Sequence, residues 1–369
     1  MDLPMRHEAG NGVLSDTQIR ILLREGGIVG PVLADRQVQP ASLDLRLGDK
    51  AYRIRASLLP GHETVAKAIE AVTQEVFSLD DRNGLVIPPG SIFLIPLQES
   101  LQLPLGISAR ANPKSSTGRL DIFVRVITDF GTAYEQIPDG YQGPLWLEVA
   151  PITFPVRVRK GSRLSQIRFR SSSHALTDDD ITSALAADAL RVEGPANLRN
   201  GLCLGLNLDF GQGRPIGWRA RRHTDVIDVD RVSHYDATEF FEPVFPRNGG
   251  TFVLDPGEFY ILASAERFEV SNLLCAEMIP VDTDLGEYRG HSAGFIDCFF
   301  GWNKPSRLVL ELRTRDVPFL VKHSQPIARL AFEPMSGAPS MGYGEDGKSN
   351  YQGQSLRLSK NFREETYAT

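Results

Sequence analysis

Short runs in which apolar and polar positions alternate fill most of this chain. In residues 145–149, for example, the two leucines and Val149 fall on one face of a strand, and Trp146 and Glu148 fall on the other. Pro-Gly, Asp-Gly and Gly-Gly pairs separate these runs and mark turns. The pattern predicts a mainly β protein, either a barrel or a jelly roll, with few helices.

Helical spacing of apolar residues is confined to a few segments. Residues 14–23 and 176–185 each follow this spacing, and Ser15 and Thr177 stand where a helix N-cap is needed. Residues 63–76 show a weaker helical pattern. We therefore expect one capped helix near the start of each half of the chain and a third helix at 63–76.

The chain repeats itself in order and at a nearly constant offset, which is the signature of duplication. The corresponding segments are 14–23 with 176–185, 89–100 with 256–267, and 145–149 with 308–312. These matches predict two homologous domains at 14–170 and 176–360, with a disordered lead at 1–13. A polar stretch, residues 171–174, joins the domains.

Composition excludes several classes of protein. The net charge of −6 argues against a general nucleic-acid binder, although it allows a local basic pocket for one polyphosphate. Apolar runs such as residues 92–97 are too short to cross a membrane, and residues 1–12 lack the apolar core of a signal peptide. Cys203, Cys275 and Cys298 are far apart and form no C-x-x-C motif, so neither a disulfide framework nor a zinc site is indicated. We expect a cytoplasmic protein that binds no membrane.

The first candidate site is the segment 112–119, which carries Lys114, Ser115, Ser116 and Arg119. Two hydroxyls, two cations and a glycine-containing turn suit a polyphosphate, because backbone N–H groups and charge-assisted hydrogen bonds both favour anions. A polar loop that caps a helix is the alternative interpretation. The Walker A spacing is missing.

Three carboxylates are further candidates. Asp297 lies in segment 293–301, which resembles a strand, a tight turn and a return strand; it can hold a sugar hydroxyl or a water, or stabilise the turn. Glu148 and Glu311 recur at equivalent mid-strand positions. If such a glutamate is buried, its pKa rises and it can exchange protons near neutral pH; otherwise it is a solvated residue on the outer face.

The glycine-rich, polar segment 343–354 is the fourth candidate. Such a segment is either a flexible end or a lid that closes over a ligand. It lacks apolar periodicity, so we expect that removing residues 340–369 leaves both domains folded.

Together these segments resemble the dCTP deaminase family of dUTPase-like proteins, in a tandem-duplicated long form. The matching segments are 39–48, 114–119, 296–297, 310–311, 332–337 and the tail residues Tyr343, Lys348 and Gln352. The resemblance implies two tandem dUTPase-like domains, each a distorted jelly roll or β-clip. It also implies a dCTP or dUTP ligand with Mg²⁺ on its triphosphate, feedback by dTTP, a homo-oligomer, and sites built between neighbouring subunits.

The two repeats depart from the family pattern in complementary ways. Repeat 1 keeps the phosphate loop, but its hairpin at 137–141 has a displaced aspartate and no matching tail follows. Repeat 2 keeps Asp297, Glu311 and the tail, but has the acidic segment 281–287 where its phosphate loop would be. We therefore expect one composite site, with the loop from repeat 1 and the base pocket from repeat 2. The reciprocal site with Glu148 would be inactive.

The resemblance also implies a role for each site residue. Glu311 would act alternately as general base and general acid, Ser115 and a backbone carbonyl would position the attacking water, and Arg119 would neutralise charge and help hold the triphosphate. The substrate contacts implied are Lys114, Ser116, Ala293, Asp297, Val309, Tyr343, Lys348 and Gln352. The H-x-E and P-C-x-x-C signature of zinc deaminases is absent from the sequence, so we expect a zinc-free reaction.

Two other functions fit the same sequence. A dUTP diphosphatase on this fold, or an enzyme that performs both steps, would release dUMP and pyrophosphate. A nucleotide-binding regulator or structural β protein would bind dCTP without releasing ammonia.

Overall fold

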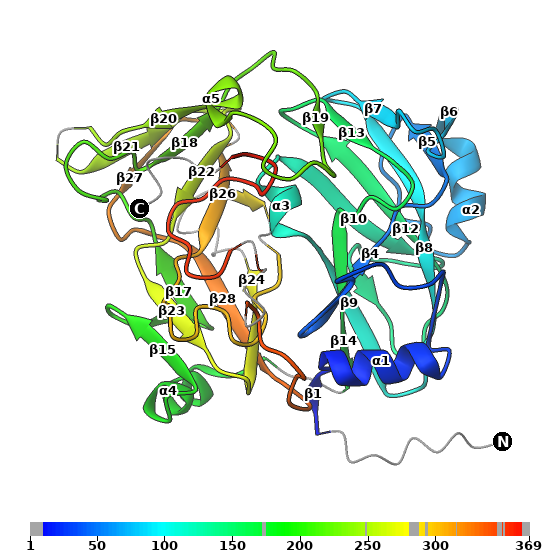
Figure 1. Ribbon diagram of the computed structural model, residues 1–369, viewed down its shortest axis with the longest axis horizontal. Helices are drawn as coiled ribbons and strands as arrows, with labels where there is room; N and C mark the ends of the chain where they lie inside the picture. The colour runs from blue at the N-terminus through cyan, green and yellow to red at the C-terminus, as the bar shows by residue number, and fades with distance from the viewer. Residues whose placement is uncertain are drawn as a thin grey trace.

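The computed structural model describes residues 10–171, 175–247, 249–279, 294–314, 316–344, 349 and 351–363, and the backbone of 288–291. It consists of two β-rich bodies that lie side by side (Figure 1). The predicted mainly β class with few short helices is confirmed. Among the described residues, none of the helices has the length and apolar content needed to cross a membrane.

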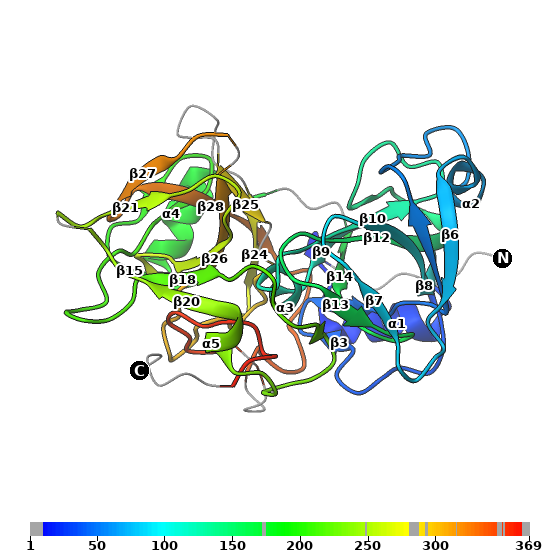
Figure 2. The same cartoon turned by 90° about the horizontal axis from the view of Figure 1, so that it is seen from above.

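Two curved sheets form most of the first body, which is at the right in Figures 1 and 2. One sheet has the strand order β11 (Gln136–Ile137), β9 (Ile107–Pro113), β14 (Ser165–Ser171), β4 (Ser42–Leu45) and β3 (Val38–Gln39), with β1 (Gly12–Val13) beside β14. The other has the order β10 (Ile122–Thr128), β12 (Gln142–Pro151), β8 (Ile92–Gln102), β5 (Lys50–Ile54) and β6 (Thr73–Ser78), with β2 (Ile28–Val29) beside β8.

The second body repeats this arrangement. Its first sheet has the order β24 (Leu274–Ile279), β28 (Pro326–Pro334), β17 (Leu202–Gly205) and β16 (Asn197–Leu198). Its second has the order β25 (Tyr288–His291), β26 (Val309–Thr314), β22 (Tyr260–Ala263), β18 (Gly217–Ala220) and β20 (Phe241–Val244). Two strand pairs complete it: β15 (Leu190–Glu193) with β23 (Arg267–Val270), and β21 (Thr251–Leu254) with β27 (Phe319–Lys322). The shared strand order bears out the duplicated fold.

The helices are short, and α1 and α4 begin at the predicted caps, Ser15 and Thr177. They are α1 (Asp16–Arg24), α2 (Val65–Ala68), the 3₁₀ turn Ile69–Ala71, α3 (Ser115–Gly118), α4 (Asp178–Ala186) and α5 (Ala237–Phe240). In α4, Asp180 N–H donates to Thr177 Oγ1 at 3.2 Å, and Thr177 N–H donates to an Asp180 carboxylate oxygen at 2.9 Å, which is a capping box. The helix expected over 63–76 is too long, because Thr73–Ser78 forms β6 and pairs with β5.

Strand alternation places the apolar residues where the sequence predicts. Leu145, Leu147 and Val149 of β12 enter the main core of the first body, whereas Trp146 packs on the other face against α2. Glu148 also lies on this other face, and it is buried rather than solvated. The second body has its own core around residues such as Leu262 and Leu310.

The second half of the chain completes the core of the first body. Strand β19 (Ile227–Asp228) pairs in parallel with β13 (Val156–Val158), which also pairs with β7 (Leu85–Ile87). Phe154 packs edge-on against Phe240 and Phe241, with ring centroids 6.0 and 5.3 Å apart. The two bodies are therefore interlocked rather than joined by a linker alone.

The C-terminal segment is also part of this core. Leu356, Leu358 and Phe362 are buried in the same cluster as the strands of the first body, and the segment runs between the bodies beside α3 (Figure 1). The expectation that both domains stay intact without residues 340–369 is wrong, because those three side chains lie in the core.

Candidate active site

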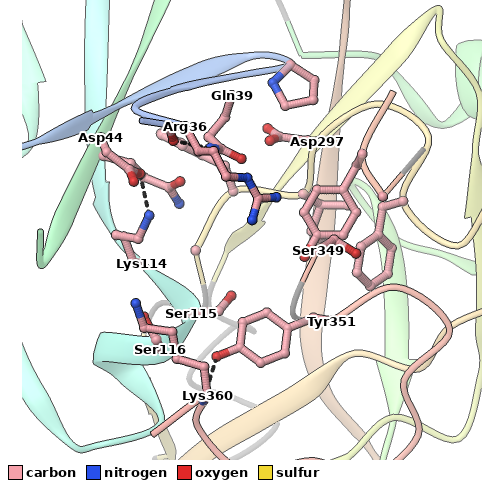
Figure 3. Close-up of a pocket in the computed structure, with 18 of the residues that line it drawn as sticks. Arg36, Gln39, Asp44, Lys114, Ser115, Ser116, Asp297, Ser349, Tyr351 and Lys360 are labelled. Atoms are coloured by element: carbon pink, nitrogen blue, oxygen red, sulfur yellow. Dashed lines mark hydrogen bonds and ion pairs between the residues drawn. The ribbon is translucent and has the colours of Figure 1, made fainter. Parts of the chain in front are cut away.

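A cavity of about 770 Å³ lies between the two bodies and is lined by both. The first body contributes the region from Asp35 to Asp44 and the start of α3; the second contributes residues 294–297 and the C-terminal segment. Figure 3 shows these groups facing one another across the cavity. The loop of repeat 1 and the pocket of repeat 2 thus meet in one place.

The predicted phosphate loop lines this cavity. Lys114, Ser115 and Ser116 are all on its wall, at the start of α3. The Lys114 ammonium forms an ion pair with the buried carboxylate of Asp44, which also lies 3.4 Å from Arg163. The sequence analysis assigned no role to Asp44, although it lies in the segment 39–48. Its charge is already matched by two cations.

Arg119 follows α3 and is almost fully buried. Its Nη1 donates to the backbone oxygen of Arg357 at 2.9 Å, and its Nη2 donates to the Gln354 side-chain oxygen at 2.9 Å. The guanidinium also stacks on the Tyr351 ring, 3.9 Å from its centroid. Arg119 therefore holds the C-terminal segment against the first body, a role that the sequence did not reveal.

Glu311 lies in β26 opposite Ile261 of β22 and is fully buried. One of its carboxylate oxygens is 3.9 Å from Arg119 Nε. The other close neighbour is Gly118, where an added side-chain carbon would lie 3.4 Å from the carboxylate carbon. Neither carboxylate oxygen accepts a hydrogen bond from another described residue.

The environment of Glu311 alters its acidity. Burial raises the pKa of its carboxyl to about 8, against the opposing effect of the Arg119 charge. Val309, two residues earlier on the same face of β26, lines the cavity, whereas the Glu311 carboxylate lies deeper, behind the wall. A carboxyl group with this pKa can accept and return a proton near neutral pH.

Asp297 lines the cavity and is bound from behind by an arginine of the first body. Arg168, fully buried in β14, donates to an Asp297 carboxylate oxygen at 3.0 Å and to the backbone oxygens of Ala276 and Ile296 at 3.0 and 3.2 Å. Burial raises the pKa of Asp297, and the Arg168 charge opposes this shift. The strand–turn–strand expected at 293–301 is not seen at 294–301, which forms turns with one bridge at Ile296.

The tail residues divide into two groups. Tyr343 lines the cavity, and its ring packs against Phe300. Gln352 instead bonds to the backbone of Phe299 and Gly301, at 3.1 and 3.0 Å, and is not on the cavity wall. Gln354 is on the wall and holds Arg119. The residues Ala293, Lys348 and 281–287 lie outside the described part of the chain.

Glu148 is remote from the cavity. Arg125 forms an ion pair with it through two nitrogens, 3.0 and 2.5 Å from the same carboxylate oxygen. The Arg125 guanidinium in turn stacks on the Tyr134 ring at 3.5 Å. The two equivalent glutamates therefore have different surroundings, since no described residue bonds to Glu311 in this bidentate way.

Arg168 and Gln354 are two further residues of the site, and the sequence contains a partial indication of each. Arg168 is a charged residue in β14 that stands between two buried apolar residues, Ile167 and Phe169. Gln354 follows Gln352 by two positions, and the sequence alone does not say which glutamine faces the cavity.

Comparisons with known proteins identify both halves of the chain. The family model described as the 2'-deoxycytidine 5'-triphosphate deaminase N-terminal domain matches residues 10–173, and the model of the C-terminal domain matches residues 177–362. The chain is thus similar over nearly its whole length to these two domains.

Individual relatives agree. A "dCTP deaminase, dUMP-forming" from Methanosphaera stadtmanae is 32% identical over 161 residues, which cover 43% of this chain and 79% of the relative. A dCTP deaminase from Natronomonas pharaonis is 34% identical over 161 residues, 42% of this chain and 79% of the relative. The crystal structure of a 2'-deoxycytidine 5'-triphosphate deaminase from Agrobacterium tumefaciens matches with a TM-score of 0.84 and 45% identity, over 88% of this chain and 99% of that one.

Proposed function

The chain belongs to the dCTP deaminase family and is a hydrolytic deaminase, and we propose that it converts dCTP to dUTP and ammonia in the cavity between its two bodies. The cavity is large enough for a nucleoside triphosphate, and both halves of the predicted site line it. Lys114 and Ser115 line the cavity from the first body, and the apolar side chains of Phe295 and Val309 line it from the second. This division suits a ligand with a charged end and a planar base.

The main support for this proposal is the raised pKa of the buried Glu311 carboxyl. Deamination requires a proton to leave the attacking water and a proton to reach the base and the departing amine. The Glu311 carboxyl can do both in turn, because its pKa is raised to about 8 by burial and no other described residue bonds to its oxygens. Ser115 on the cavity wall would help position the water.

Lys114, Ser115 and Ser116 would face the triphosphate from the first body. Asp297, held by Arg168, would accept a hydrogen bond from the sugar. Arg119 also lines the cavity, so it could still help to hold the triphosphate, and its hydrogen bonds to the tail would make it a positioning residue beside Glu311 as well. Its charge near the carboxylate would still stabilise the ionised form.

Mg²⁺ would accompany the triphosphate. Asp44 already contacts Lys114 and Arg163, and Asp297 contacts Arg168, so these cavity carboxylates are matched by protein cations. In the described part of the chain, no group of three His, Cys, Asp or Glu side chains could hold a metal. The donor set therefore fits an ion that is held mainly by phosphate oxygens and water, whose role is to neutralise phosphate charge.

A second product is also favoured by a specific observation. The relative from Methanosphaera stadtmanae is named a dUMP-forming dCTP deaminase, so a bifunctional reaction that ends in dUMP and pyrophosphate is the competing proposal. Either product would feed dUMP and dTMP synthesis. Homo-oligomerisation and dTTP feedback stay predictions of the family resemblance, and a cytoplasmic location stays a prediction from the sequence composition.

Product analysis tests both proposals. The purified protein would be incubated with dCTP and Mg²⁺, and ammonia, dUTP, dUMP and pyrophosphate would be measured together. Ammonia with dUTP supports simple deamination, and ammonia with dUMP and pyrophosphate supports the bifunctional reaction. Tight dCTP binding with no ammonia would show that neither reaction occurs and that the protein is a nucleotide binder.

A further inference from the structure

Lys360 is a cation on the cavity wall that the sequence analysis did not single out. Lys114 and Arg163, the two cations whose charges act on Lys360, each have a protein partner, because both contact Asp44. No hydrogen bond or ion pair joins the Lys360 ammonium to any other described residue. Its charge is therefore unmatched by the part of the protein that the structure describes.

The surroundings of Lys360 make its charged ammonium unfavourable unless an anion lies beside it. Burial lowers the pKa of Lys360, and repulsion by Lys114 and Arg163 lowers it further, against attraction by Asp44 and Asp230. Figure 3 shows the Lys360 side chain alongside Ser116, on the side of the cavity that carries Lys114. Two lysines that face one hydroxyl-lined space are an arrangement that an anion with several charges would stabilise.

The backbone on both sides of Lys360 is fixed. Ser359 Oγ donates to the backbone oxygen of Ser116 at 2.9 Å, and Lys360 N–H donates to the Tyr351 hydroxyl oxygen at 3.2 Å. Asn361 Nδ2 donates to the backbone oxygen of Arg231 at 2.7 Å. Because these bonds fix the backbone of residues 359–361 in the folded protein, only the Lys360 side chain has to become ordered when a ligand binds.

We propose that Lys360 is a substrate-binding residue that contacts a phosphate group of the nucleotide, on the same side of the cavity as Lys114 and beside Ser116. This inference rests on the proposed function, since it takes the polyanion to be the nucleotide triphosphate. It assigns to the anchored C-terminal segment a phosphate contact that the family resemblance led us to expect from Lys348.

Calorimetric titration of three variants tests this assignment. Lys360→Gln removes the charge, Lys360→Arg keeps it, and Lys322→Gln is the matched control, because Lys322 is exposed on β27 away from the cavity. The probes are dCTP with Mg²⁺, inorganic triphosphate, and deoxycytidine, which has no phosphate.

We expect Lys360→Gln to weaken dCTP and inorganic triphosphate by about tenfold to a hundredfold, the scale of one charge-assisted hydrogen bond. Deoxycytidine binding should stay within about twofold. Lys360→Arg should retain most of the triphosphate affinity, and Lys322→Gln should match the unmodified protein. Melting temperatures should be alike for all four proteins, because the Lys360 ammonium has no bond to another described residue.

Unchanged triphosphate binding in Lys360→Gln, or an equal loss for deoxycytidine, would overturn the inference. A large fall in melting temperature would overturn it as well, since the side chain would then serve the fold. Ammonia release by the unmodified protein is scored separately. If it fails while triphosphate binding still depends on Lys360, the proposed function is wrong and the phosphate contact stands.

Discussion

Arg119 Nε lies 3.9 Å from a carboxylate oxygen of Glu311, although the two residues belong to different halves of the chain. Each residue comes from a different repeat, and each is almost fully buried. The contact brings together the last residue of the predicted phosphate loop and the predicted proton carrier. Both parts of the proposed composite site therefore come from a single chain.

Glu311→Gln should abolish ammonia release and leave dCTP binding within about tenfold, because it removes the proton carrier and keeps the shape. Glu148→Gln is the matched control, since Glu148 is equally buried but is bound by Arg125 away from the cavity. The control should lose stability and keep most of its turnover. Steady-state ammonia release at a temperature where both variants are folded decides the matter, and equal losses from the two variants would contradict the division between the repeats.

The pKa of Glu311 predicts how activity depends on pH. The ionised carboxylate is the form that accepts a proton from water, so kcat/KM for dCTP should rise with pH and level off above about pH 8, the value expected from burial. A pH profile between 5.5 and 9.5, in roughly half-unit steps, measures this. A profile that is flat across this range would exclude Glu311 as the base in its present environment.

The raised pKa of Glu311 also predicts how the free energy of unfolding depends on pH. Stability should fall as the pH rises, whereas activity should increase. Glu311 binds its proton more tightly in the folded protein than in the unfolded chain, so its contribution to stability is greatest below the unfolded pKa near 4.5 and falls as the pH rises to about 8. Glu311→Gln should therefore be more stable than the unmodified protein at pH 7, by up to about 3 kcal/mol, and the difference should vanish near pH 4. Urea unfolding at the two pH values checks this expectation.

Much of the fold could be predicted from the sequence because strand periodicity and helix caps are local signals. The alternation in β12 placed Leu147 and Trp146 on the correct faces, and Thr177 marked the start of α4. The interlock could not be predicted, because the fit of Phe154 against Phe240 depends on contacts between distant parts of the chain.

The candidate site shows the same limit. Lys114, Ser115 and Asp297 lie in the cavity, as chemical type and motif suggested. The bonding of Arg119 to the tail and the burial of Leu356 could not be deduced, since the tail looks polar when its composition is taken alone. A few apolar side chains are enough to anchor such a segment once a core from another domain is available to them.

Arg119→Ala should do more than weaken triphosphate binding. It removes the hydrogen bonds to Arg357 and Gln354 and the stacking on Tyr351, and it leaves Glu311 without its nearest cation. We expect a loss of about 2–4 kcal/mol in unfolding free energy, since each lost hydrogen bond to the charged guanidinium contributes about 1.5–3 kcal/mol. Faster proteolysis of the C-terminal segment should accompany it. A variant with normal stability and a defect confined to triphosphate binding would restore our sequence-based role for Arg119.

Phe362→Ala should destabilise the first body, although Phe362 is near the C-terminus. Its ring packs against Phe240 and Phe241, with centroids 5.5 and 5.4 Å away, and is buried. The expected cost is about 3–5 kcal/mol, as for other buried phenylalanines. Thermal melting measures it. Arg363→Ala is the control, because Arg363 is the exposed neighbour, and it should melt with the unmodified protein.

Activity should survive a zinc-selective chelator and depend on Mg²⁺. The three cysteines, Cys203, Cys275 and Cys298, are buried and form no disulfide, and among the described residues they belong to no group of three potential metal ligands; Mg²⁺ would arrive on the triphosphate. Ammonia release would be measured after treatment with a zinc-selective chelator and, separately, after removal of Mg²⁺. Zinc and Mg²⁺ would then be added back one at a time. Activity that is lost and then restored by zinc alone would overturn the carboxylate mechanism.

The pairing of β13 with β19 bears on how this gene can change. The first repeat now takes one neighbouring strand and several aromatic side chains from the second, so a deletion that returned the gene to a single copy would leave an open sheet edge and an exposed aromatic patch. The duplication is therefore hard to reverse. Whether the protein tolerates a substitution at Phe154 depends on how the new side chain packs against Phe240 and Phe241 in the second half of the chain. The core of the first repeat is therefore complete only when the second half of the chain is present.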